Sequence, residues 1–141
     1  MIQRIQSLWL IITSAIAAFI WFTPIYTGIA ADGIEKTYTI SESLPLMLIV
    51  ALSILVPLVT IFLFKKRDLQ KKFILLQIVF ALGIHLFEYF NAEKFKTDFT
   101  IQQGHWHIGA IAPFFMIAFL FFAYRGIRKD EKMLSEADRL R

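Results

Sequence analysis

Four long apolar stretches divide the chain, at residues 5–22, 44–64, 73–90 and 108–124, with polar segments between them. A helix needs about 20 apolar residues to cross the ~30 Å hydrocarbon core of a bilayer. The pattern therefore predicts an all-α membrane protein with four transmembrane helices in a single domain of 141 residues. The first stretch could instead be a secretory signal peptide, but its apolar run exceeds the ~7–15 residues of such signals, so we expect a retained helix.

The connections predict a small β cap at one end of the helices. In the first connection, Asp32 and Gly33 form a turn signal between two segments rich in Ile, Tyr and Thr, which is typical of a β-hairpin. In the second, residues 95–101 (FKTDFTI) alternate apolar and polar side chains, which predicts a third strand. The connection at residues 65–72 is short, so the second and third spans should form an antiparallel helical hairpin.

Two prolines and the charged tail complete the predicted helices. Pro57 lies inside the second span, where a proline removes a backbone hydrogen bond and should kink the helix. Pro113 is expected to interrupt the fourth span. Residues 125–141 are strongly charged but keep apolar residues at helical spacing. We therefore expect the fourth helix to continue out of the membrane as an amphipathic extension.

The distribution of positive charge predicts the orientation. Of the 15 Lys and Arg residues, 12 lie at the N-terminus, in the 65–72 connection and in the tail, and 3 lie in the other two connections. Such a bias over short loops predicts a bacterial cytoplasmic (inner) membrane protein with both termini cytoplasmic. The basic segments are expected to contact membrane lipid. No nucleic-acid-binding motif accompanies them, so we expect no nucleic-acid partner.

Composition narrows the possible chemistry. There is no cysteine, which excludes disulfides, thiolate metal sites and cysteine nucleophiles. The sequence contains no glycine-rich phosphate loop, no zinc-protease motif and no serine nucleophile motif. We therefore predict a protein that is not an enzyme and has no cofactor.

One polar cluster is the main candidate site. Glu88 is the only charged residue inside the four stretches, and His85 lies one helical turn before it. His105 and His107 precede the fourth span and should start at nearly the same depth. Three interpretations stay open: a hydrogen-bonded structural cluster, which we favour, a metal or haem site, and a proton- or quinone-handling site. The remaining polar residues of the spans are too scattered to predict a path across the membrane: Thr13, Ser14, Ser53, Thr60 and Gln77.

The cytoplasmic ends are the second candidate site. The tail has Met133, Ala137 and Leu140 at a spacing that places them on one helical face. Arg4 leaves the membrane on the same side and can meet the acidic residues of the tail. We predict a docking surface for other inner-membrane subunits, formed by Arg4, Met133, Ala137, Leu140 and Arg141.

The two ends of the chain also carry a resemblance. The opening MIQRIQSLWL, the Thr/Tyr-rich first connection and the closing IRKDEKMLSEADRLR resemble an uncharacterised family of small four-span bacterial inner-membrane proteins. The resemblance covers nearly the whole chain. It implies the four-span fold and a bacterial cytoplasmic membrane, and it implies no activity and no site residues.

These observations lead to a predicted function and two alternatives. We expect a non-catalytic accessory or scaffolding subunit of a larger inner-membrane complex. The first alternative is a redox- or proton-handling membrane protein that uses His85, Glu88, His105 and His107. The second is a small-solute transporter that works as a homo-oligomer.

Overall fold

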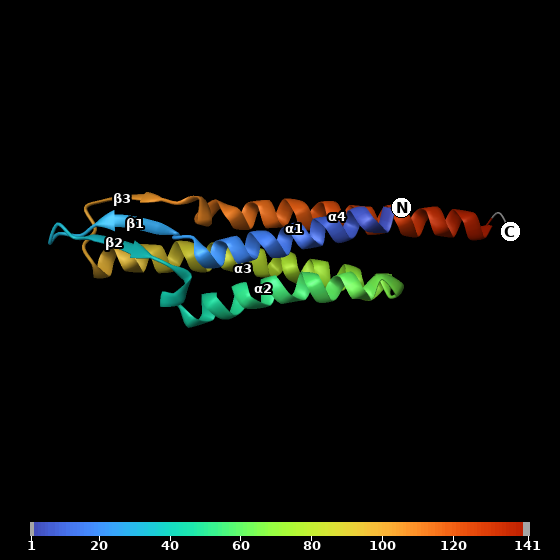
Figure 1. Ribbon diagram of the computed structural model, residues 1–141, viewed down its shortest axis with the longest axis horizontal. Coiled ribbons are helices and arrows are strands. Elements are labelled where there is room, and N and C mark those ends of the chain that lie inside the picture. Colours follow the sequence, from blue (N-terminus) through green and yellow to red (C-terminus); the bar gives the residue numbers. More distant parts are fainter. Residues whose placement is uncertain (1, 140–141) are drawn as a thin grey trace.

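The computed structural model describes residues 2–139, with the side chains of residues 5–136. Four long helices form an elongated antiparallel bundle: α1 (Ile2–Phe22), α2 (Leu44–Phe62), α3 (Arg67–Asp98) and α4 (Ala112–Arg139). All four are long and apolar enough to cross a membrane. Both termini lie at one end, which we call the termini end, and the strands lie at the other, which we call the sheet end (Figure 1).

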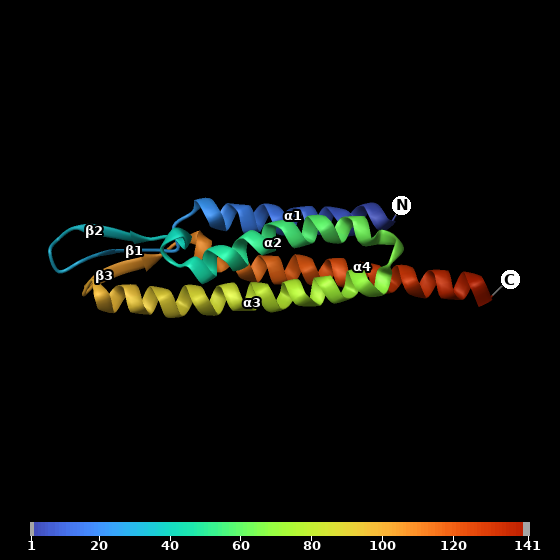
Figure 2. The ribbon, with the colours of Figure 1, turned by 90° about the horizontal axis from the view of Figure 1, so that it is seen from below.

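The helices pack in a ring, so that α1 lies against α2 and α4, and α3 lies against the same two helices (Figure 2). Buried residues recur at intervals of three and four along each helix, which is the spacing of left-handed bundles with knobs-into-holes packing. In α3 this buried stripe contains three polar residues: Gln70, Gln77 and Glu88. The outward faces are apolar and exposed, as expected of surfaces that contact lipid.

The predicted hairpin is confirmed. Strand β1 (Tyr26–Ile29) pairs antiparallel with β2 (Glu35–Tyr38), and Gly33 adopts φ = 79° in the turn, a conformation that favours glycine. A third strand, β3 (Gln103–Trp106), pairs with the other edge of β1 and gives the sheet order β2-β1-β3.

The third strand differs from the prediction. Residues 95–98 of the predicted strand belong to α3, which continues beyond the apolar stretch to Asp98. The reason is that Ala92 and Phe95 extend the buried stripe of α3 at helical spacing, and the sheet packs on them. The helix ends at a turn in which Thr100 has φ = 48°, and β3 follows.

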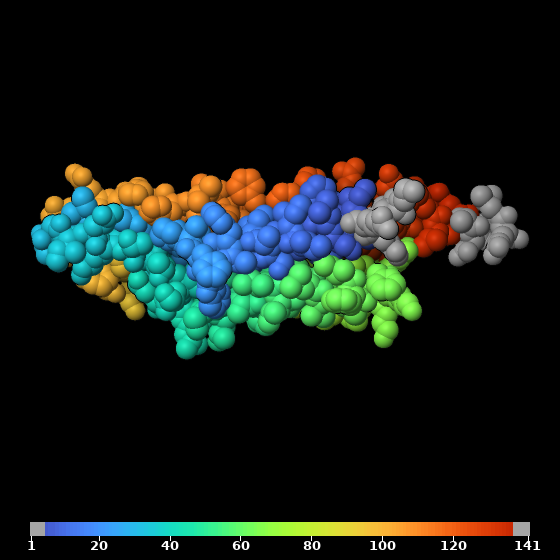
Figure 3. Space-filling view, in the orientation of Figure 1, coloured from blue at the N-terminus to red at the C-terminus, as the bar shows by residue number. Residues whose placement is uncertain are grey.

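The remaining connections are short 3₁₀ turns. They are η1 (Ile40–Glu42) before α2, η2 (Leu63–Lys65) between α2 and α3, and η3 (Ile108–Ile111) before α4. Pro113 therefore lies in the first turn of α4, where a proline is well tolerated, and the predicted interruption of the fourth span is wrong. Pro57 does lie inside α2, which remains one helix around it. The tail is helical as predicted up to Arg139, where the described residues end, and α4 projects beyond the other helices at the termini end (Figure 3).

Candidate functional site

Glu88 is the most unusual side chain of the bundle. It is 1% exposed, and neither carboxyl oxygen has a hydrogen-bond partner among the residues that the structure describes. Nδ1 of His85 lies 4.0 Å from Oε2 of Glu88, which is beyond hydrogen-bond distance. An ionisable residue inside a transmembrane segment is expensive to bury and is by default a candidate for function.

Tyr38 of β2 lies near Glu88 and lines a surface cavity at the sheet end. Its ring packs against Phe95 of α3, with 5.7 Å between ring centroids. Its buried hydroxyl lies near the side chains of Asn91 and Ser43, but no hydrogen bond of good geometry reaches it in the described part of the chain. Burial, followed by the negative charge of the Glu42 and Glu88 carboxyl groups, raises the pKa of Tyr38 to about 12. The hydroxyl therefore keeps its proton at physiological pH and can donate it to a hydrogen bond.

A surface cavity of about 390 Å³ reaches Tyr38 from the sheet end. Its polar lining comes from Glu42, Ser43, Asn91, Lys94 and Asp98. Asn91 lies three residues after Glu88 on α3, on the next turn, and its Nδ2 donates to Oγ of Ser43 at 3.2 Å. Burial raises the pKa of the Glu42 carboxyl at the edge of this cavity. The cavity thus brings solvent and several polar groups close to the buried hydroxyl of Tyr38, and Asn91 in its lining lies one helical turn from Glu88.

A second set of polar groups lies near the middle of the bundle. Nε2 of Gln70 donates to the backbone oxygen of Thr60 at 3.2 Å, which fixes the level of α3 against α2. Gln77 and Ser53 each lie seven residues farther toward the sheet end, so the antiparallel register places them at one level. Both are 0% exposed, and neither side chain has a hydrogen-bond partner among the residues described.

Two further features add polar groups at the level of Gln77 and Ser53, which we call the central layer. Ser14 of α1 reaches the same level, because its Oγ donates to the backbone oxygen of Ile54 at 2.8 Å. Pro57 has no N–H, so the backbone oxygen of Ser53 lacks its helical donor. Ser14, Ser53 and Gln77, which were predicted to be too scattered for a path across the membrane, are therefore grouped at one level, but a single polar layer is not such a path. The prediction treated the spans separately, whereas the register between helices brings these residues together.

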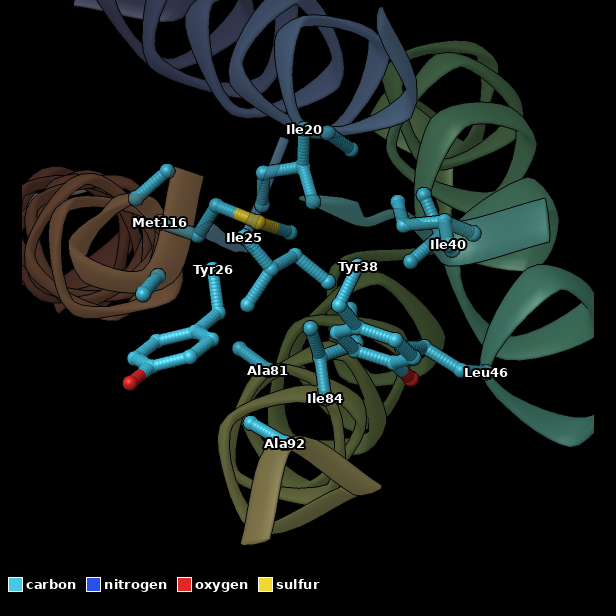
Figure 4. Close-up of a cluster of buried hydrophobic side chains, with 14 of the residues drawn as sticks. Ile20, Ile25, Tyr26, Tyr38, Ile40, Leu46, Ala81, Ile84, Ala92 and Met116 are labelled. Atoms are coloured by element: carbon cyan, nitrogen blue, oxygen red, sulfur yellow. The ribbon is translucent and has the colours of Figure 1, made fainter. Parts of the chain in front are cut away.

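An apolar block separates the central layer from Glu88. The two levels are 11 residues apart on α3, or roughly 16 Å along the helix. Side chains from all four helices fill this space, including Ile20, Leu46, Ile84 and Met116 (Figure 4). In this conformation Glu88 is therefore close to the cavity at the sheet end and is sealed from the central layer.

The structure does not unite the three histidines with Glu88. His85 packs edge-on against Phe114, with 4.3 Å between ring centroids. The rings of His105 and His107 lie together, with 4.7 Å between their centroids, and Nε2 of His107 is 2.8 Å from Oγ1 of Thr27. Within the described residues, no group of three or more His, Cys, Asp or Glu side chains is arranged to hold a metal ion.

Strand alternation explains this separation. Tyr26, Tyr38 and Trp106 are partners in the sheet and share the face that packs on α3. Thr27 and His105 are the next pair along and point to the opposite face. The sequence could not show on which face of the sheet the histidines lie.

Several polar side chains at the termini end are paired between helices. Nε2 of Gln6 donates to Oδ2 of the buried Asp130 at 2.6 Å, which joins α1 to α4. Nζ of Lys71 lies 2.9 Å from Asp68 and 2.8 Å from Glu131, which joins α3 to α4. The sequence did not single out these pairs.

Most of the predicted docking residues cannot be placed. Leu140 and Arg141, together with the side chains of Arg4 and Ala137, lie outside what the structure describes. Met133 lies on the projecting part of α4 and is 39% exposed.

Comparison with known proteins gives one match. A family model described as a domain of unknown function (DUF4293) matches residues 2–140. No curated protein and no solved structure matches the chain.

Proposed function

Because the chain belongs to the DUF4293 family, which carries no functional assignment, we propose a function from the site itself: the protein is a proton-handling membrane protein that exchanges a proton at Glu88 with the compartment at the sheet end. The observation that carries this proposal is that Glu88 is buried in a membrane-spanning helix while both its oxygens lack a hydrogen-bond partner among the described residues. A carboxyl group that served only to hold the bundle together would be expected to have partners.

The surroundings of Glu88 supply a route for the proton and neighbouring side chains that allow a second arrangement of hydrogen bonds. Tyr38 lines the cavity and its buried hydroxyl lies near Glu88, so a small movement would let it accept from cavity water on one side and donate to Glu88 on the other. Either protonation state of Glu88 leaves polar atoms unpaired in the present arrangement, so the proton exchange should accompany a small movement. Tyr38 and His85 are the neighbours placed to complete the missing hydrogen bonds, and the apolar block confines the exchange to one side of the membrane.

The proposal includes an orientation. The bias of Lys and Arg toward the termini end supports a bacterial inner-membrane protein with cytoplasmic termini and a sheet end that faces outward. Glu88 would then respond to the proton concentration outside the cytoplasmic membrane. Cysteines introduced at Thr37 and Thr97 should react with an impermeant thiol reagent in intact spheroplasts, and those at Gln70 and Ser135 should not.

A hydrophobic carbodiimide tests the proton exchange. This reagent adds to a protonated carboxyl group in an apolar environment and leaves a stable mass increase on that residue. We expect labelling of Glu88 that changes with the pH of the medium at the sheet end, measured by mass spectrometry of peptides. Tyr38→Phe should slow the response, because it removes the hydroxyl between the cavity and Glu88. Labelling of Glu88 that is absent, or independent of pH, would contradict the proposal.

A second candidate function is the accessory or scaffolding role. The observation that favours it is that α4 projects beyond the bundle and exposes Met133 and Leu134, which are 39% and 51% exposed. In this role the projecting helix docks on another inner-membrane subunit. After chemical cross-linking in membranes, the protein should migrate in a larger complex, and Met133→Asp with Leu134→Asp should release it. The control Ser135→Asp lies on the same segment and should not. Migration of the unaltered protein at its own mass would exclude the role.

A further inference from the structure

A basic pocket lies at the termini end, where α2 turns into α3. Seven residues line it, and we call it the turn pocket: Lys65, Lys66, Arg67, Asp68, Leu69, Lys72 and Glu131. It has a volume of about 590 Å³ and contains four cationic side chains and two acidic ones. None of these residues belongs to the site around Glu88.

The two acidic side chains do not neutralise the cations of the turn pocket. Asp68 and Glu131 are both held by Lys71, a residue outside the lining, with nitrogen–oxygen distances of 2.9 and 2.8 Å. Among the residues described, Lys65, Lys66, Arg67 and Lys72 have no carboxylate partner. Nη1 of Arg67 is buried and has no hydrogen-bond partner in the same part of the chain. The pocket therefore has unmatched positive charge and an unused guanidinium nitrogen.

The boundary of the pocket favours a membrane lipid over a soluble anion. Leu69 lines the pocket, and Phe62 and Phe64 lie just before its first residue in the chain; the three side chains are 38%, 79% and 47% exposed. These side chains belong to the ends of two membrane-spanning helices, so the cations lie where hydrocarbon gives way to water. A phospholipid bound here would have its phosphate among the cations and its acyl chains along the apolar side chains.

We propose that the turn pocket is a binding site for the phosphodiester headgroup of an anionic membrane phospholipid, with Arg67 as the main ligand. The planar guanidinium group can donate two hydrogen bonds to phosphate oxygens, and Lys65, Lys66 and Lys72 add positive charge. Lys71 has a separate role: its bonds to Asp68 and Glu131 keep those carboxylates away from the phosphate and fix α4 beside the pocket.

Native mass spectrometry of the purified chain in neutral detergent tests this proposal. Phosphatidylglycerol and phosphatidylcholine with the same acyl chains are titrated separately, and free glycerol 3-phosphate forms a third arm. We expect tight retention of phosphatidylglycerol, weak retention of phosphatidylcholine and no retention of glycerol 3-phosphate. The double variant Arg67→Gln/Lys72→Gln should lose at least about tenfold in affinity for phosphatidylglycerol.

The matched control removes the same charge from the same end of the protein. Arg128→Gln/Lys129→Gln changes two exposed cations of α4 that do not line the turn pocket, and it should bind phosphatidylglycerol like the unaltered chain. Equal losses in the two double variants would show diffuse attraction and overturn the proposal. Binding of glycerol 3-phosphate as tight as that of the lipid would overturn it in favour of a soluble phosphate ligand. Circular dichroism checks folding. If the Arg67→Gln/Lys72→Gln variant does not fold, the variant Lys65→Gln/Lys66→Gln, whose changes lie outside α3, takes its place. Unchanged lipid affinity in this second variant also overturns the proposal.

Discussion

The two ends of the bundle treat buried polar groups differently. At the termini end, Gln6 is bonded to Asp130, Gln70 to Thr60, and Lys71 to two carboxylates. From the central layer to the sheet end, Gln77, Ser53, Glu88 and the hydroxyl of Tyr38 have no side-chain partners among the described residues. Buried polar groups that stabilise a fold are normally hydrogen-bonded. Nη1 of Arg67 and Oδ1 of Asp130 are also unpaired at the termini end, so the difference is one of degree. It indicates that hydrogen bonds between helices stabilise the termini end, and that the more numerous unpaired groups of the other half leave it freer to change.

The largest expected effect comes from replacing a buried polar residue that is hydrogen-bonded, compared with replacing one that is not. Gln6→Leu leaves the buried carboxyl of Asp130 without its donor and should lower the free energy of unfolding by about 1–3 kcal/mol. Glu88→Leu removes a carboxyl that has no donor to lose, so it should lower stability far less or raise it. Unfolding of the two variants in detergent, followed by circular dichroism, makes this comparison. Equal destabilisation would show that Glu88 has a structural partner and that the two ends do not differ.

A smaller effect is expected in the central layer. Gln77→Leu replaces an unpaired amide by an apolar side chain of similar size and should raise the free energy of unfolding by about 1 kcal/mol. The matched variant is Gln70→Leu, which breaks the bond to Thr60 and should lower stability instead. Opposite signs in the same unfolding assay support the distinction between the two ends. A loss of stability in both variants would mean that Gln77 has a partner in the folded protein.

The smallest effect concerns pH at the edge of the cavity. Burial raises the pKa of Glu42 above its ordinary value of 4.5, so the folded state disfavours the charged form. Ionisation of Glu42 should therefore destabilise the protein slightly as pH rises through the raised pKa, and the loss should be complete above it. Glu42→Gln should be slightly more stable than the unaltered chain at neutral pH, with no such advantage below pH 4.5. The unfolding midpoints of the two proteins across this range provide the check, and an advantage that grows in acid would refute the assignment.

The sequence predicted the fold correctly where the structure of a segment depends on local signals. Apolar length located the four helices, and Asp32-Gly33 located the hairpin turn, because both signals are local. It failed at residues 95–98, where a strand-like alternation in FKTDFTI competed with a helical stripe that includes Ala92 and Phe95. The helix forms because the sheet covers those two residues. The sequence of one segment does not reveal which other segment will pack on it.

The candidate site was only half visible for the same reason. Glu88 stood out as the one charge within an apolar stretch, and it remains the centre of the site. Tyr38 was missed because its role depends on which face of the sheet packs against α3. Gln77 and Ser53 were noticed but not recognised as a pair, because their common level depends on the register between α2 and α3. The spacing of Gln70, Gln77 and Glu88 along one stripe was the available signal, since polar residues at core positions of a membrane helix are costly.

Infrared difference spectroscopy of the protein in lipid nanodiscs tests the central claim most directly. Spectra are recorded in acidic and alkaline buffer, and the absorption of protonated carboxyl groups is compared between the unaltered chain, Glu88→Gln and a control, Glu93→Gln. The control removes a carboxyl group of α3 that is paired with Lys96. The account predicts a carboxyl difference band that is lost in Glu88→Gln, is retained in Glu93→Gln, and shifts when Tyr38 is replaced by Phe. A difference spectrum that Glu88→Gln leaves unchanged would show that Glu88 exchanges no proton, and would contradict the account.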